Sequence, residues 1–251
     1  MGSIFNVLIM GGLALLAGRM YFSGLFHHYR AFFAFLVFDA LRSAAMAPLS
    51  PSGFAYEVAW VCTEPLEWFF YVLVVLEIYA LVLRDYRGLA TVGRWCLMAA
   101  VSVAMAAAFL TLLAPSHPSQ QSRLMTCYYV AERAVYFSLA IFLLTILALL
   151  MRYPIALTRN IVAHSLIFSV YFLSYTFLYE LLTALGHRAI GVVTYSVMSV
   201  YVAVLCAWLF LLTRGGELRS RQLRPSWMPG REEDLVRQLN LFNATLQALI
   251  D

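Results

Sequence analysis

Residues 54–84 form a long apolar and aromatic stretch that nevertheless contains Glu57, Glu64, Glu67 and Glu77. A helix of about 30 residues rises roughly 45 Å, which is long enough to cross a lipid bilayer. An ionised carboxylate at mid-membrane costs roughly 2.5 kcal/mol or more, so it persists only where it faces protein or water, has a partner, or keeps a proton. We therefore expect this segment to be a helix inside a bundle, with its glutamate face turned inward.

The composition of the whole chain agrees with a membrane protein. Hydrophobic residues make up 63% of the chain and charged residues only 12%, whereas soluble domains carry about 25% charged residues. The apolar runs are long and do not alternate with polar residues, which argues against a β-barrel. We predict an all-α, polytopic membrane protein with a seven-transmembrane-helix bundle. The expected spans cover residues 4–22, 29–49, 54–84, 92–113, 124–151, 160–184 and 190–213.

The arginines are distributed unevenly between the two sides of the predicted bundle. One side carries Arg30, Arg84, Arg87, Arg94, Arg152, Arg159, Arg214, Arg219, Arg221 and Arg224, and the other only Arg123 and Arg188. Because cytoplasmic loops are enriched in basic residues, this pattern predicts an external N-terminus and a cytoplasmic C-terminus. The expected location is the plasma membrane, the inner membrane of a bacterium.

The chain divides into three parts. Residues 1–213 are the transmembrane domain, 214–230 are a basic linker with Gly and Pro, and 231–251 are a cytoplasmic helix. The last part carries apolar residues spaced 4, 3, 4 and 3 apart, namely Leu235, Leu239, Phe242, Leu246 and Leu249. This spacing predicts an amphipathic helix on the membrane or bundle, or a short dimeric coiled coil. The expected partners are the lipid bilayer and, through 231–250, a second copy or another membrane or cytoplasmic protein. No nucleic-acid partner is expected.

Charged side chains occupy the outer halves of several predicted spans, together with aromatic ones. Asp39 and Arg42 are three residues apart and can pair within one helix. The complete candidate set is Asp39, Arg42, Glu57, Glu64, Glu67, Glu132, Arg133 and Glu180, with Trp60, Trp68 and Tyr128 beside them. One interpretation is a buried ion network that sets helix register. The other is an outward-facing acidic and aromatic pocket for a small cationic ligand or for protons, because aromatic faces attract cations.

No motif points to catalysis. The five histidines fall at different predicted depths, and no HExxH or ExxH pattern occurs within a span, so neither a metal nor a cofactor is expected. No nucleophile elbow is present, and we predict that the protein is not an enzyme. The chain also contains no lysine, so no residue can form a lysine Schiff base.

Seven helices with an external N-terminus resemble the topology of rhodopsins and receptors, although no sequence motif carries this resemblance. Residues 190–213 lack the lysine that a retinal pigment requires. The leading hypothesis is a membrane sensor or receptor-like protein. A small proton-coupled transporter is the first alternative, since residues 60–84 align weakly with 128–152 and pair Glu64 with Glu132. A structural or assembly subunit of a membrane complex is the second.

Overall fold

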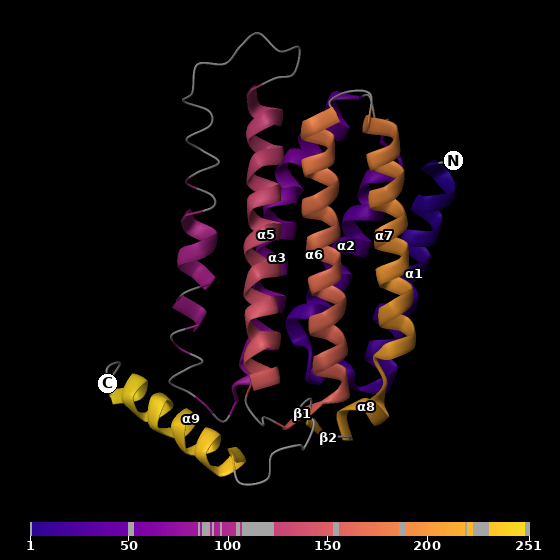
Figure 1. The fold of residues 1–251 in the computed structure, drawn as a ribbon. Helices are drawn as coiled ribbons and strands as arrows, with labels where there is room; N and C mark the ends of the chain where they lie inside the picture. Colours follow the sequence, from indigo (N-terminus) through magenta and orange to yellow (C-terminus); the bar gives the residue numbers. More distant parts are fainter. Residues whose placement is uncertain are drawn as a thin grey trace.

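A computed structural model describes most of the chain as helices (Figure 1). The described residues are 2–49, 53–84, 86, 91, 93–95, 97–103, 106, 123–152, 156–185, 189–218, 220–222 and 231–248. The long helices are α1 (Gly2–Ser23), α2 (Arg30–Met46), α3 (Phe54–Val82), α5 (Arg123–Arg152), α6 (Arg159–Leu185), α7 (Ile190–Leu211) and α9 (Arg231–Ala248). The short elements are η1 (Leu25–His27), β1 (Ala156–Thr158), α8 (Arg214–Leu218) and β2 (Ser220–Gln222).

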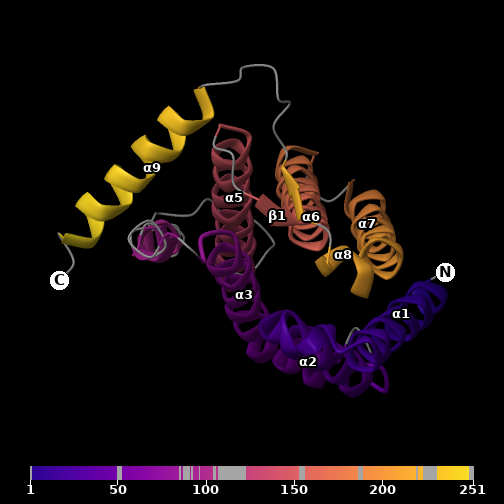
Figure 2. The ribbon, with the colours of Figure 1, turned by 90° about the horizontal axis from the view of Figure 1, so that it is seen from below.

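Six long helices form a closed ring (Figure 2). Consecutive helices run in opposite directions from α1 to α3 and from α5 to α7, whereas α3 and α5 run in the same direction (Figure 1). Helix α1 packs against α2 and α7, α2 packs against α3, and α6 packs against α5 and α7. Contacts of α3 with α5 and α6 complete the ring. Short connections favour this antiparallel neighbour packing. We call the end that holds η1, β1, β2 and α8 the tail end, and the opposite end, where α2 ends and α3 begins, the far end (Figure 1).

Five helices are long and apolar enough to cross a membrane, namely α1, α3, α5, α6 and α7. The sequence predicted seven spans. The second of these corresponds to α2, whose 17 residues carry charged side chains and which is not among the five. Within the predicted fourth span, Gly93–Val103 forms a shorter apolar helix, and most of the rest lies outside the described residues. The five helices indicate a membrane protein.

Large apolar side chains occur both inside the ring and on its outer surface. Leu13, Phe32, Phe35 and Phe168 are completely buried in one core. Exposed apolar side chains include Phe22, Phe69, Phe177 and Phe210. A water-soluble protein rarely exposes so many large apolar side chains. The outer surface is therefore suited to lipid.

The segment after α7 is held against the tail end of the bundle. The sequence predicted a linker over residues 214–230, but 214–218 form helix α8, and β2 pairs antiparallel with β1. Helix α9 lies outside the ring at the tail end (Figure 1). Of the five apolar positions predicted for docking, Leu246 is half-buried against the core, and the side chains of Leu235, Leu239, Phe242 and Leu249 lie outside the described set.

Glu77 of α3 caps the start of α2 from a neighbouring helix. Its carboxylate accepts the backbone N–H of Ala31 at 2.8 Å and that of Phe32 at 3.2 Å. The first amides of a helix have no partner within the helix itself, so a carboxylate there compensates for them. This contact explains why an acid is tolerated near the tail end of a long apolar helix.

The change Glu77→Ala is expected to lower the free energy of unfolding by about 1–3 kcal/mol, because it leaves two amides without an acceptor. Equilibrium unfolding of the purified protein in bicelles measures the loss. Glu77→Gln is the matched control, since it keeps one acceptor oxygen and should lose less. An alanine variant as stable as the wild type would show that the amides find other partners.

Candidate functional site

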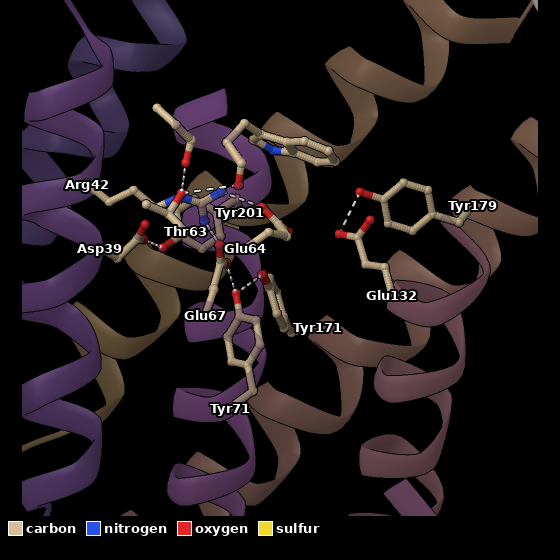
Figure 3. Close-up of polar contacts among 12 residues, drawn as sticks. Asp39, Arg42, Thr63, Glu64, Glu67, Tyr71, Glu132, Tyr171, Tyr179 and Tyr201 are labelled. Atoms are coloured by element: carbon tan, nitrogen blue, oxygen red, sulfur yellow. Dashed lines mark hydrogen bonds and ion pairs between the residues drawn. The ribbon is translucent and has the colours of Figure 1, made fainter. Parts of the chain in front are cut away.

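Arg42 is the centre of a polar cluster between α2 and α3 (Figure 3). From α2, its guanidinium forms ion pairs with both Glu64 and Glu67 of α3. The side chains of the three residues are only 5–11% exposed. Each carboxylate is contacted by a different guanidinium nitrogen, which suits arginine because its planar fork presents several N–H donors in fixed directions. The pairs join α2 to α3.

Asp39 has a different partner from the one expected. The sequence suggested that Asp39 and Arg42 could pair within α2. Instead the Asp39 carboxylate accepts a hydrogen bond from the hydroxyl of Tyr201 in α7, and Arg42 reaches across to α3. Asp39 is 7% exposed, and among the described residues it forms no ion pair. Arg42, three residues further along α2, still interacts with Asp39 electrostatically without forming an ion pair with it.

Tyrosines extend the cluster across the bundle toward α6. The Tyr71 hydroxyl donates to Glu67 at 2.5 Å and lies 2.6 Å from the Tyr171 hydroxyl. Because the single Tyr71 proton points to Glu67, Tyr171 is the donor to Tyr71. The centroid of the Tyr175 ring lies 4.5 Å from the centroid of the Tyr171 ring. Four of the ring helices, α2, α3, α6 and α7, thus meet at this polar centre.

Glu132 of α5 lies on the side of Glu64 that faces away from Arg42 (Figure 3). It is 2% exposed, and one of its oxygens accepts from the Tyr179 hydroxyl of α6 at 2.9 Å. Its other oxygen has no hydrogen-bond partner in the described part of the chain. Arg133 and Glu180 form a separate ion pair, whose side chains are 31% and 63% exposed. The structure therefore brings Glu132 into the cluster and leaves Arg133 and Glu180 outside it.

A cavity of about 470 Å³ adjoins the cluster on the side of the far end. Its polar walls come from Asp39, Arg42 and Glu67, and Trp60 is among its aromatic walls. Tyr56, Tyr171, Tyr175 and Tyr201 supply the other aromatic walls, and Asn6, Ile9, Met10, Ser43, Met46, Ala47 and Leu49 complete the lining. A volume of roughly 300–1,000 Å³ is typical of small-molecule sites.

The remaining predicted site residues have mixed outcomes. Trp60 lines the cavity, and Trp68 is buried in the core. The side chains of Glu57 and Tyr128 lie outside the described set.

Sequence reasoning missed the tyrosines of α6 and α7. Tyr171, Tyr175 and Tyr179 are four residues apart, so they lie on one helical face. That periodicity was a usable signal, because three hydroxyls on one face of a membrane helix need polar partners. Tyr201 had no such signal, since its partner Asp39 is 162 positions away.

The buried charges of the cluster do not balance. Asp39, Glu64, Glu67 and Glu132 are four carboxylates with 2–8% exposure, and Arg42 is the one basic side chain with which any of them pairs in the described residues. Buried charges are stable only when they are paired or neutralised by a proton. The cluster must therefore hold protons, a cation, or both. Among the described residues, no group of three His, Cys, Asp or Glu side chains is arranged to hold a metal ion.

A second polar network closes the tail end, and we call it the tail latch. Its members are Tyr29, Asn160, Thr213 and Glu217. The Asn160 amide donates to the Thr213 carbonyl and to Glu217, both at 2.8 Å, and accepts the Thr213 N–H at 3.3 Å. The Tyr29 hydroxyl donates to the same Glu217 carboxylate. Tyr29 and Asn160 are both completely buried, so the tail latch fastens α8 to α2 and α6.

No protein-family model, curated protein or solved structure matches the chain. The class of protein is therefore defined by fold and site alone. It is a helical protein with five helices able to cross a membrane, and its ring of helices encloses a carboxylate-rich, tyrosine-rich cluster beside a small-molecule-sized cavity.

Proposed function

We propose that the protein is a multi-pass membrane sensor that binds a small organic cation in the cavity beside Asp39. The observation that carries the proposal is the unbalanced carboxylate of Asp39, which lines the cavity and has no ion-pair partner in the described residues. A cation bound there would neutralise this carboxylate. Tyr171, Tyr175, Tyr201 and Trp60 surround the same space, and aromatic faces attract organic cations.

The helices that line the cavity also carry the tail latch. Helix α2 contributes Asp39 to the cavity and continues back to Tyr29, next to its first residue. Helix α6 contributes Tyr171 to the cavity and Asn160 to the tail latch. A small shift of either helix on ligand binding would therefore reach Glu217 and the segment that leads to α9. A signalling change of this kind requires that the packed helices have two arrangements, one with and one without ligand. In this proposal the cavity faces outward, the N-terminus is external and the tail is cytoplasmic.

Tetramethylammonium is a suitable first probe, because it is a compact organic cation without hydrogen-bond donors. We expect saturable binding to the protein in lipid nanodiscs, measured by isothermal titration calorimetry. Asp39→Asn keeps an oxygen for Tyr201 but removes the charge, and it should weaken binding by at least about ten-fold, or 1.4 kcal/mol. Glu180→Gln is the matched control and should bind like the wild type, since Glu180 lies outside the cavity.

Equal binding by wild type and Asp39→Asn, or no binding by either, would contradict the proposal. Native mass spectrometry of protein released gently from its own membrane complements this test. A retained small-molecule mass that is lost in Asp39→Asn would identify the natural ligand. A chain bound only to other protein subunits would favour the assembly-subunit alternative instead.

A proton-coupled transporter is the second candidate function. The observation in its favour is that the cavity adjoins the far end, whereas the tail latch closes the opposite end, as in one state of an alternating-access carrier. Cation flux into liposomes separates the two candidates. Flux that stops in Asp39→Asn supports the transporter, and binding without flux supports the sensor.

A further inference from the structure

Glu132 is the carboxyl group in the cluster whose charge the described residues compensate least. It lies away from the cavity, whose lining does not include it, and it is 2% exposed. Arg42 is engaged by Glu64 and Glu67. The strongest interactions of Glu132 with titratable groups are those with Glu64 of α3, Tyr136 of its own helix and Tyr179 of α6, and Tyr175 of α6 also interacts with it. None of these groups supplies a positive charge.

The two carboxylate oxygens of Glu132 differ in their hydrogen bonding. Tyr179 donates to one oxygen, and the second oxygen has no hydrogen-bond partner among the described residues. An ionised carboxylate in this position would be buried without a cation and beside the Glu64 carboxylate, which is strongly unfavourable. A protonated carboxyl is neutral, and its O–H can be directed at the neighbouring Glu64 carboxylate. Protonation thus resolves both the charge and the unpartnered oxygen.

A line of tyrosines connects Glu132 with the cavity. It begins at Glu67, which lines the cavity, and continues through the hydrogen bonds to Tyr71 and Tyr171. The next two steps are ring contacts. The ring centroids of Tyr171 and Tyr175 lie 4.5 Å apart, and those of Tyr175 and Tyr179 lie 6.1 Å apart. Tyr179 then donates to Glu132. Figure 3 shows Tyr71 and Tyr171 meeting at their hydroxyls, and Tyr179 directed at the Glu132 carboxyl.

We propose that Glu132 is a proton-binding site that holds a proton in the empty protein and exchanges it with the cavity through this tyrosine line, releasing it when a cation binds beside Asp39. In the release step the Glu132 O–H bond breaks, the electron pair stays on the carboxylate, and one proton reaches water in the cavity. The bound cation supplies the positive charge that the proton removes, so the net charge of the cluster is unchanged. Only the cation-triggered release rests on the proposed function.

Infrared spectroscopy tests the proton on Glu132 without any ligand. The full-length protein in nanodiscs at neutral pH should show the carbonyl stretch of a protonated carboxylic acid, and this band should shift in D₂O. We expect Glu132→Gln to remove the band and Glu180→Gln to retain it. If Glu132→Gln does not fold, Glu132→Asp should move the band to a new frequency. A band unchanged by both substitutions, or no band in the wild type, would overturn the proposal.

The tyrosine line and the release step have separate readouts. Tyr179→Phe removes the hydroxyl that donates to Glu132 and should slow the shift of the Glu132 band after transfer to D₂O, whereas an unchanged rate would contradict the pathway. On addition of tetramethylammonium, a pH-indicator dye should report roughly one proton released for each ion bound. Ion binding without proton release would overturn the coupling. Absence of ion binding would contradict the proposed function. It would not affect the infrared test of the proton on Glu132, because that test uses no ligand.

Discussion

Replacing Arg42 with alanine is expected to lower the free energy of unfolding by about 3–5 kcal/mol, because it leaves buried carboxylates without their cation. Arg42 forms ion pairs with Glu64 and Glu67, and the side chains involved are at most 11% exposed. The same change also removes the bridge between α2 and α3. Reversible unfolding in bicelles, for example by steric trapping, measures this loss.

Arg133→Ala is the matched control for this experiment. Arg133 also forms an ion pair with a glutamate, but the side chains of that pair are 31% and 63% exposed. Water and salt screen such a pair, so its loss should cost no more than about 1 kcal/mol. Adding Glu64→Gln to Arg42→Ala removes one of the uncompensated charges and should restore part of the stability. If the two arginine variants were equally stable, the central ion pairs would contribute little to the fold.

Asn160→Ala is expected to detach α8 from the bundle. The side chain of Asn160 makes three hydrogen bonds, to the Thr213 carbonyl, the Thr213 N–H and Glu217. At about 1 kcal/mol for each, the local stability of α8 should fall by roughly 3 kcal/mol. Hydrogen exchange of the amides in residues 214–218 measures this change, because local opening exposes them. The exchange rates of these amides should rise by about two orders of magnitude at 1.4 kcal/mol per ten-fold.

Asn240→Ala serves as the matched control, since Asn240 is exposed on α9. It should leave the exchange of residues 214–218 unchanged. A substitution at Gly216 of α8 tests the packing of α8 against Asn160, because an added Cβ would overlap the Asn160 side-chain amide. Gly216→Ala should therefore also speed exchange in α8. Unchanged exchange in both Asn160→Ala and Gly216→Ala would show that the tail latch does not hold α8.

The polar members of the cluster were predictable from the sequence, but their partners were not. Asp39, Arg42, Glu64, Glu67 and Glu132 stand out because a charged side chain in an apolar helix must face protein or a cavity. Spacing within one helix suggested a pair between Asp39 and Arg42. In the structure these residues contact α7 and α3 instead, because a choice between partners on different helices depends on how each helix is rotated about its axis.

The same limit explains why other contacts could not be predicted from the sequence. Arg133 and Glu180 are charged residues within predicted spans, like the members of the cluster. In the structure they pair with each other, with side chains 31% and 63% exposed, and lie apart from the cluster. Glu77 looks like an isolated acid until α2 is placed beside it. The tail latch joins residues of three separate elements across as many as 188 positions, and no local pattern indicates such a contact.

The sequence by itself determined the helical class of this protein and its suitability for a membrane, because long apolar runs can satisfy their backbone hydrogen bonds in lipid only as helices or closed barrels, and only helices fit these runs. It also determined that acids would lie inside the bundle, since exposure to lipid is too costly. Only the tertiary structure decided which carboxylates pair with Arg42, which ones face the cavity and which ones form no ion pair in the described residues. Those outcomes depend on helix rotation and on distances between side chains from different helices, and packing of the whole ring sets both.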